Sequence, residues 1–228
     1  MKYNPESLVQ ILLTRFADMM ILNMLFLVTS LPVVTIGAAW TSLYYVALKI
    51  LQDDKGEAIS VIKSYFHSFR QNFLIATGIW ILALLLGGVL FLDIRIINSM
   101  EMSGLQVILR IAVGAVVLLF LAALQFSFPM LSRFRMSFLS AIKNAVLMAI
   151  GHFPRAFLML GLTAGLVWIT LLNKYTIYTG IFVWMTFGFS AVALIKAKQF
   201  LPLFAGIGGG NTGKKSGEET EEEEKTGG

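Results

Sequence analysis

The sequence of 228 residues contains no cysteine and only two histidines, His67 and His152. Without cysteine there is no disulfide framework, no thiolate nucleophile and no Cys-based metal site, and two histidines cannot form a histidine-rich metal site. Charged residues are also scarce, at 14% against about 25% in average soluble proteins, whereas hydrophobic residues reach 57%. This excess of apolar side chains must face lipid, so the composition predicts a membrane protein with no metal and no other cofactor.

Long runs without a formal charge organise the chain. The first covers residues 19–48, which is thirty residues, against the ~20 that a helix needs to cross a bilayer. Similar runs cover residues 73–92, 111–132 and 175–195, and a shorter one covers residues 156–173. We therefore predict an all-α, polytopic membrane helical bundle with five transmembrane helices.

Pro32 interrupts the first of these runs. Proline removes a backbone donor and clashes with the preceding helical turn, so a kinked span or a broken helix is expected. A hairpin at this point would raise the number of spans from five to six. Buried polar side chains in lipid need partners, and glycine lets helices approach closely. The candidate residues for a kink or for helix packing are therefore Asn23, Pro32, Thr35 and Gly37, and a kink that lines a ligand path is the alternative.

Two of the polar connections have amphipathic patterns. In residues 58–73 apolar side chains recur every three or four positions opposite polar ones, which is typical of a helix at the membrane surface. The connection over residues 133–155 has a similar stripe and predicts a second interfacial helix, bounded by Pro129 and Pro154. This connection contains no acidic residue, so its cations are expected to contact anionic lipid head groups or an acidic partner protein. These cations are Arg133, Arg135, Lys143 and Arg155.

The distribution of charge predicts the topology. Residues 1–205, the predicted membrane-embedded domain, carry 15 Lys/Arg and 7 Asp/Glu, whereas residues 206–228 carry 3 Lys and 6 Glu. With five spans, the positive-inside rule places the N-terminus outside the cell membrane and the C-terminus in the cytoplasm. A hairpin at Pro32 would move the N-terminus inside. Because the basic surplus lies beside membrane spans and no reading element is present, we do not expect nucleic-acid binding.

The sequence also argues against several chemical activities. Residues 206–228 are Gly-rich and then acidic, which predicts a disordered tail. Gly208, Gly213 and Lys214 fit a phosphate-loop pattern, but Lys215 stands where that motif needs a hydroxyl. Ser, His and acidic residues do not occur together at any one membrane depth, so we expect no catalytic site and no enzyme. No ionisable residue lies near the centre of the five runs, which argues against an ion-driven transporter.

Several motifs resemble those of a known family. They are Asn23-Met-Leu-Phe-Leu-Val-Thr-Ser-Leu31-Pro32-Val-Val-Thr35-Ile36-Gly37-Ala38-Ala39, then Phe66-x-x-Phe69-Arg70-x-Asn72-Phe73, and Phe128-Pro129-Met-Leu-Ser-Arg133-Phe134 with Lys143-Asn144-Ala145. Together they make the chain similar to the YesL family of bacterial integral membrane proteins over most of residues 8–203. The family is a domain of unknown function and has no catalytic residues to transfer to this chain.

The resemblance implies an association with carbohydrate import and degradation. We therefore expect a non-enzymatic accessory component of carbohydrate uptake of the ABC type. Its partners would be the lipid bilayer and the permease or ATPase subunits of an importer. The alternative is a stand-alone small-molecule transporter or channel, in which the break at Pro32 lines the path.

Overall fold

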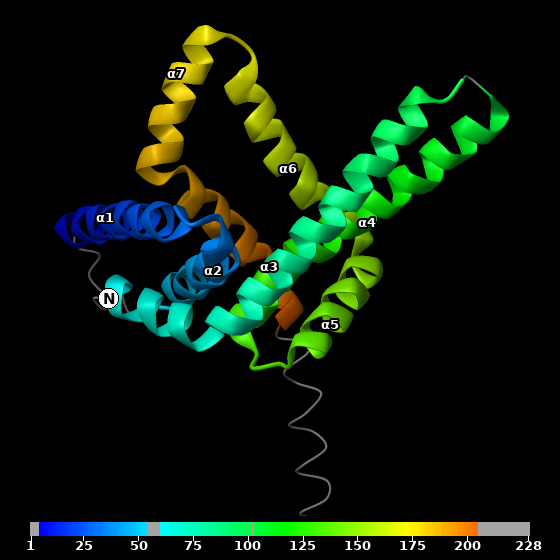
Figure 1. Cartoon of the computed structure of the whole chain (residues 1–228). Coiled ribbons are helices and arrows are strands. Elements are labelled where there is room, and N and C mark those ends of the chain that lie inside the picture. Colours follow the sequence, from blue (N-terminus) through cyan, green and yellow to red (C-terminus); the bar gives the residue numbers. More distant parts are fainter. Residues whose placement is uncertain (1–4, 54–59, 102, 205–228) are drawn as a thin grey trace, which may run out of the picture.

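The computed structural model describes residues 5–53, 60–101 and 103–204, and all regular structure within them is helical (Figure 1). After a π-helical turn, helical conformation continues over residues 189–204, so that Lys174–Phe204 is one helical segment. The tail predicted over residues 206–228 lies outside the described residues. The elements are α1 (Pro5–Ser30), the 3₁₀ turn η1 (Val33–Thr35), α2 (Ile36–Gln52), α3 (Val61–Ser99), α4 (Gly104–Arg133), α5 (Phe138–Gly151), α6 (Phe153–Leu171), α7 (Lys174–Val183) and the π-helical turn η2 (Trp184–Gly188).

Within the described residues, six helical segments are long and apolar enough to cross a membrane. Large apolar side chains such as Leu85, Ile108 and Trp168 are exposed on them, as expected for surfaces that face lipid. Helix α5, with 14 residues, is too short to span the bilayer. The chain is thus an all-α, multi-pass membrane protein. Its six candidate spans agree with the number expected for a hairpin at Pro32, not with the five expected for a single kinked span. The six segments are Leu13–Ser30, Val33–Gln52, Val61–Ser99, Gly104–Arg133, Phe153–Leu171 and Lys174–Phe204.

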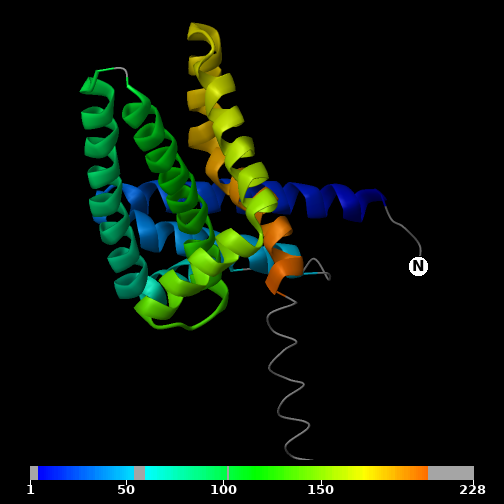
Figure 2. The same cartoon turned by 90° about the vertical axis from the view of Figure 1, so that its right-hand side faces the viewer.

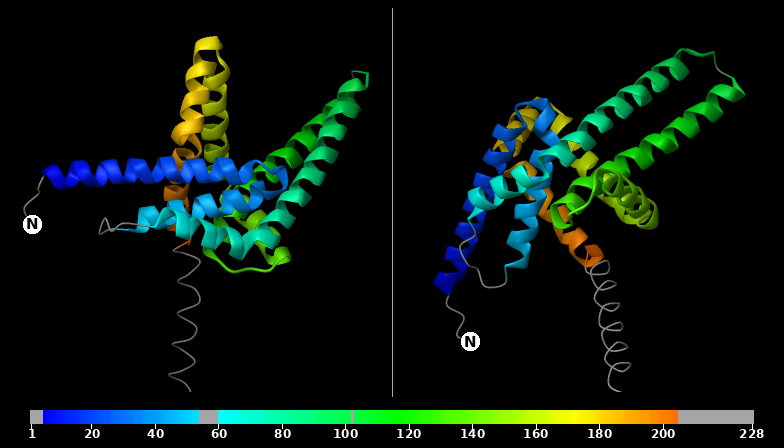
Figure 3. Two further views of the ribbon diagram at one scale, coloured as in Figure 1. Left: turned by 60° about the vertical axis from the view of Figure 1, so that its left-hand side comes forward. Right: turned by 60° about the horizontal axis from the view of Figure 1, so that its bottom comes forward.

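Two helical hairpins rise from a common layer. Helices α3 and α4 form one hairpin, α6 and α7 form the other, and their tips point the same way (Figures 1 and 2). Helices α1 and α2 run across the foot of both hairpins (Figure 3). We call α1, α2, α5 and the first part of α3 the base. The helical segment over residues 189–204 descends from η2 through this base.

Helix α2 lies at the centre of the base. Of its apolar segment 61% is buried inside the protein, against 22% or less in the other five candidate spans. Small residues such as Ala38, Ala39 and Ala47 are fully buried and let neighbouring helices approach closely. A ring contact between Phe26 and Trp40, with centroids 4.8 Å apart, links α1 to α2. Another, between Phe126 and Phe200 with centroids 5.3 Å apart, links α4 to the helical segment over residues 189–204.

Both predicted amphipathic helices are present, with different boundaries. The first is the opening part of α3, which continues without a break into the span and reaches 39 residues. The second is α5, whose buried face consists of Ala141, Ala145 and Ala149. Pro154 lies in the first turn of α6 as a boundary residue should, but the prediction for Pro129 is wrong. Pro129 lies inside α4, which continues for one more turn to Arg133.

Candidate functional site

Three of the predicted kink residues lie around the turn between α1 and α2. The first apolar run forms a hairpin, because α1 ends at Ser30 and α2 begins at Ile36. Pro32 is exposed in this turn. The Thr35 hydroxyl donates to the carbonyl oxygen of Thr29 at 2.6 Å and to that of Pro32 at 2.7 Å. Thr35 thereby donates a hydrogen bond to a carbonyl oxygen in the last turn of α1, where carbonyl groups lack partners within the helix.

Helix α3 holds the same turn from one side. The indole Nε1 of Trp80 donates to the carbonyl oxygen of Val33 at 2.8 Å. Gly37 is buried against α3, because a Cβ atom at this position would collide with the carbonyl oxygen of Ala76 and lie 2.7 Å from the Cβ of Trp80. The turn residues therefore bring α1, α2 and α3 into close contact. They line none of the four cavities described below.

Asn23, the fourth of these residues, lies far from the turn and joins the first helix to the last. Its side chain is fully buried. The amide nitrogen donates to the carbonyl oxygens of Trp184 at 3.0 Å and Met185 at 2.8 Å. The amide oxygen accepts from the backbone N–H groups of Phe189 at 3.0 Å and Ser190 at 3.2 Å. Asn23 thus satisfies four backbone groups in and just after η2, where the regular helical ladder is interrupted.

The four cations predicted to contact lipid or a partner protein lie in two different parts of the structure. Arg133 and Arg135 lie at the end of α4 and just beyond it, next to the base. An Arg133 guanidinium nitrogen donates to the side-chain oxygen of Gln52 at 3.0 Å. Lys143 and Arg155 are exposed on α5 and α6 and line neither of the polar cavities described next.

An open groove of about 750 Å³ lies where the start of α3 meets Arg135. Among the residues that the structure describes, three cations and a histidine line it and no acidic side chain does. With its amide oxygen turned toward Arg135, Gln71 accepts from Nε of that arginine at 2.7 Å and donates to Nε2 of His67 at 3.2 Å. We call this the basic groove; it is lined by Ser60, Ile62, Lys63, Phe66, His67, Arg70, Gln71 and Arg135.

A smaller pocket of about 270 Å³ lies next to the basic groove, between the end of α2 and the end of α4. The ring of Tyr45 in this pocket is 6.4 Å from the ring of His67 in the groove. Lys49 donates to the hydroxyl of Ser64 at 2.9 Å. We call it the Lys49–Arg133 pocket; it is lined by Tyr45, Leu48, Lys49, Gln52, Ser132 and Arg133.

The structure also shows a buried cation that the sequence analysis missed. Lys196 is 6% exposed, and its ammonium group donates to the side-chain oxygen of Gln125 on α4 at 2.9 Å. The Gln125 amide donates in turn to the carbonyl oxygen of Ala156 on α6 at 3.4 Å. Lys196 directly follows the last uncharged run, and the continued helical spacing of apolar residues after it, at Phe200 and Leu203, was the available signal.

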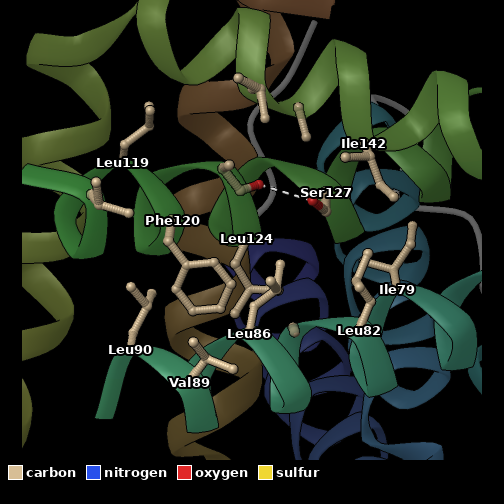
Figure 4. A pocket seen from close by; sticks show the side chains of 15 residues that line it. Ile79, Leu82, Leu86, Val89, Leu90, Leu119, Phe120, Leu124, Ser127 and Ile142 are labelled. Carbon is tan, nitrogen blue, oxygen red and sulfur yellow. Dashed lines mark hydrogen bonds between the residues drawn. The ribbon is translucent and has the colours of Figure 1, made fainter. Parts of the chain in front are cut away.

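The remaining two cavities are apolar. One, of about 320 Å³, lies between α3, α4 and α5 and is lined mainly by aliphatic side chains such as Leu86 and Leu124 (Figure 4). Ser127 carries the one hydroxyl among the described lining residues, and it donates its proton to the carbonyl oxygen of Ala123 at 2.9 Å, so this hydroxyl has no free donor for a ligand. The other, of about 350 Å³, lies between α6 and the segment from α7 onward.

Comparison with known proteins adds one match. Among the described residues, no three His, Cys, Asp or Glu side chains gather where they could hold a metal ion. No curated protein and no solved structure matches the chain. Residues 19–94, which cover the C-terminal part of α1, all of α2 and most of α3, match the family described as "Protein of unknown function, DUF624", in agreement with the resemblance of this region to the YesL proteins.

Proposed function

We propose that this protein is a non-enzymatic accessory component of a carbohydrate uptake system of the ABC type, and that its basic groove docks an acidic surface of the importer permease or its ATPase. One observation carries the proposal. Cations from two separate connections, Lys63 and Arg70 on α3 and Arg135 after α4, line one groove, and no acidic side chain of the described residues lines it with them. The link to carbohydrate uptake is supported by the resemblance to the YesL family.

The groove has the composition of a protein contact surface. Arginine and aromatic residues are enriched in interfaces, and clusters of one charge select a partner of opposite charge. Ile62 and Phe66 are exposed beside the cations, at 55% and 38% of their surface, and offer apolar anchors. Gln71 and His67 add further hydrogen-bonding groups. A partner with acidic residues around an apolar centre therefore matches this surface better than a uniform layer of lipid head groups.

The same proposal assigns the base to the cytoplasmic side of the cell membrane. Whether α1 and α2 both cross the bilayer or both lie at its surface, the number of crossings is even and both termini share one side. Of the 15 Lys/Arg in residues 1–205, only Arg95, Arg110 and Lys174 fall in the sequence near the two hairpin tips. The positive-inside rule then places the base, the basic groove and both termini in the cytoplasm.

Co-purification in a mild detergent tests the docking proposal. The unmodified protein should retain an importer permease or ATPase subunit, identified by mass spectrometry. Arg70→Glu combined with Arg135→Glu should abolish this association, because it replaces two cations of the groove with anions. The matched control, Lys143→Glu with Arg155→Glu, makes the same charge change outside the groove and should retain the partner. Membrane insertion should be the same in all three proteins.

Two results would contradict the docking proposal. In the first, the groove variant keeps its partner while its association with anionic vesicles weakens, which would assign the groove to lipid. In the second, the unmodified protein yields no importer subunit at all.

A stand-alone transporter is the second candidate function, and the buried Lys196 favours it. Ionisable residues inside a membrane bundle commonly mark ion or substrate pathways. If the protein transports a solute alone, proteoliposomes that contain only this chain should show flux, and Lys196→Met should reduce that flux. Equal uptake by protein-containing and empty liposomes would exclude this candidate.

A further inference from the structure

The Lys49–Arg133 pocket has the features of a small ligand site. It is formed by the last two turns of α2 and the last turn of α4, and its volume is about 270 Å³. Leu48, which is 3% exposed, and the ring of Tyr45 provide an apolar wall. The hydroxyl of Ser132 donates its proton to the carbonyl oxygen of Pro129 at 2.7 Å.

Both cations of this pocket have neutral partners. Lys49 donates to Ser64 and Arg133 donates to Gln52, so each retains N–H groups that these single bonds do not use. Asp53, which directly follows α2, forms an ion pair with Arg15. In the part of the chain that the structure describes, no acidic side chain lines the pocket itself. Two positive charges are therefore held together in a small space without a carboxylate among its described lining residues.

The start of α3 adds to this positive potential. The bond from Lys49 to Ser64 places the first turn of α3 beside the pocket. This turn contains no acidic residue, and the side chain of its N-cap Ser60 makes no capping hydrogen bond. The N-terminus of a helix carries a partial positive charge that favours anions.

We propose that the Lys49–Arg133 pocket binds a phosphate-type dianion, as free phosphate, a phosphate monoester or the phosphate of a lipid head group. Its charge matches that of one lysine and one arginine. The guanidinium of Arg133 can bind two phosphate oxygens at once, and Lys49 supplies a compact point charge. The wall of Tyr45 and Leu48 suits the carbon portion of a monoester. This proposal does not depend on docking of an importer subunit, because it concerns a different cavity.

Equilibrium binding of radiolabelled inorganic phosphate to the detergent-purified full-length protein tests the soluble form of the ligand. Nanodiscs of phosphatidylcholine with and without phosphatidic acid, analysed by native mass spectrometry, test the lipid form. Lys49→Met and Arg133→Met should each weaken binding of the relevant probe at least about tenfold, as expected for loss of one charge-assisted hydrogen bond. Arg133→Lys should weaken it less, because the charge is kept. Lys143→Met, which removes an exposed cation elsewhere, should leave binding unchanged.

The outcomes separate the two sources of ligand. Saturable binding of free phosphate that is lost in the pocket variants supports a soluble ligand. Retention of phosphatidic acid alone, lost in the same variants, supports a lipid ligand. The proposal is overturned if neither probe binds, or if binding persists in the Lys49→Met, Arg133→Met double variant. The docking variant Arg70→Glu with Arg135→Glu should still bind a probe of the pocket, so failure of one proposal can be distinguished from failure of the other.

Discussion

Replacing Asn23 with leucine should destabilise the protein more than any other single polar substitution in α1. Leucine branches at the same atom but has two methyl groups in place of the amide, so it cannot form the two hydrogen bonds to the carbonyl oxygens of Trp184 and Met185, nor accept those from Phe189 and Ser190. A hydrogen bond between membrane helices contributes on average about 0.6 kcal/mol, and a buried backbone group left without a partner costs about 1–3 kcal/mol. The expected loss in the free energy of unfolding is therefore roughly 2–5 kcal/mol.

Equilibrium unfolding in mixed detergent, with SDS as denaturant, measures this loss. Tryptophan fluorescence is a suitable signal, because the indole of Trp184 donates to the hydroxyl of Thr170 at 3.1 Å next to the Asn23 contacts. The control is Asn98→Leu, which removes an exposed amide whose oxygen accepts from Arg110 at 3.1 Å. This change should alter the unfolding free energy by less than about 0.5 kcal/mol. If the two variants have the same stability, the buried amide does not hold the first and last helices together.

Three further predictions concern other parts of the fold. Gly37→Ala should lower the unfolding free energy by about 1–3 kcal/mol, measured in the same detergent assay, because the added methyl group collides with the backbone of α3. Gln125→Leu should cost about 1.5–3 kcal/mol by removing the hydrogen bond to a buried ammonium, whereas adding Lys196→Met to it should recover most of the loss; a larger loss in the double variant would refute this explanation. A reporter active only outside the cytoplasm should give signal when inserted after Met100 and none when fused after Phe204, and the reverse pattern would refute the proposed topology.

The helices could largely be predicted because their signals are local. Four of the six candidate spans each correspond to one uncharged run, the first run covers parts of the other two, and α5 is indicated by the apolar periodicity between Phe138 and Ala149. The turn between α6 and α7 is also set locally, because the side chain of Asn173 caps α7 by accepting from the N–H groups of Tyr175 and Thr176. These features depend on residues that are close together in the sequence.

The consequence of Pro32 for the path of the chain could not be predicted in the same way. Proline explains why the helix breaks, but the break is compatible with a kink and with a hairpin alike. The hairpin is fixed by contacts with α3, above all by the bond from Trp80 to the carbonyl oxygen of Val33, 47 residues away in the sequence. No local pattern encodes a contact of this kind.

The candidate site shows the same division between local and distant information. The sequence identified Arg133 and Arg135 as unpaired by nearby acids, but it could not show that they belong to different cavities. Arg135 meets Gln71 on α3, whereas Arg133 meets Gln52 on α2. Lys49 was visible only as one cation of a polar connection, and its place opposite Arg133 depends on how α2 packs against α4.

The bond between the first and last helices also constrains how the protein is made. Asn23 emerges from the ribosome early, but its partners lie 161–167 residues later in the chain. Until those residues enter the membrane, this amide is a polar group in lipid without its native partners, and α1 cannot take its final position. Nascent chains arrested before residue 184 should therefore hold α1 loosely, open to crosslinking by the insertion machinery, and release of the finished C-terminal helix should end that contact.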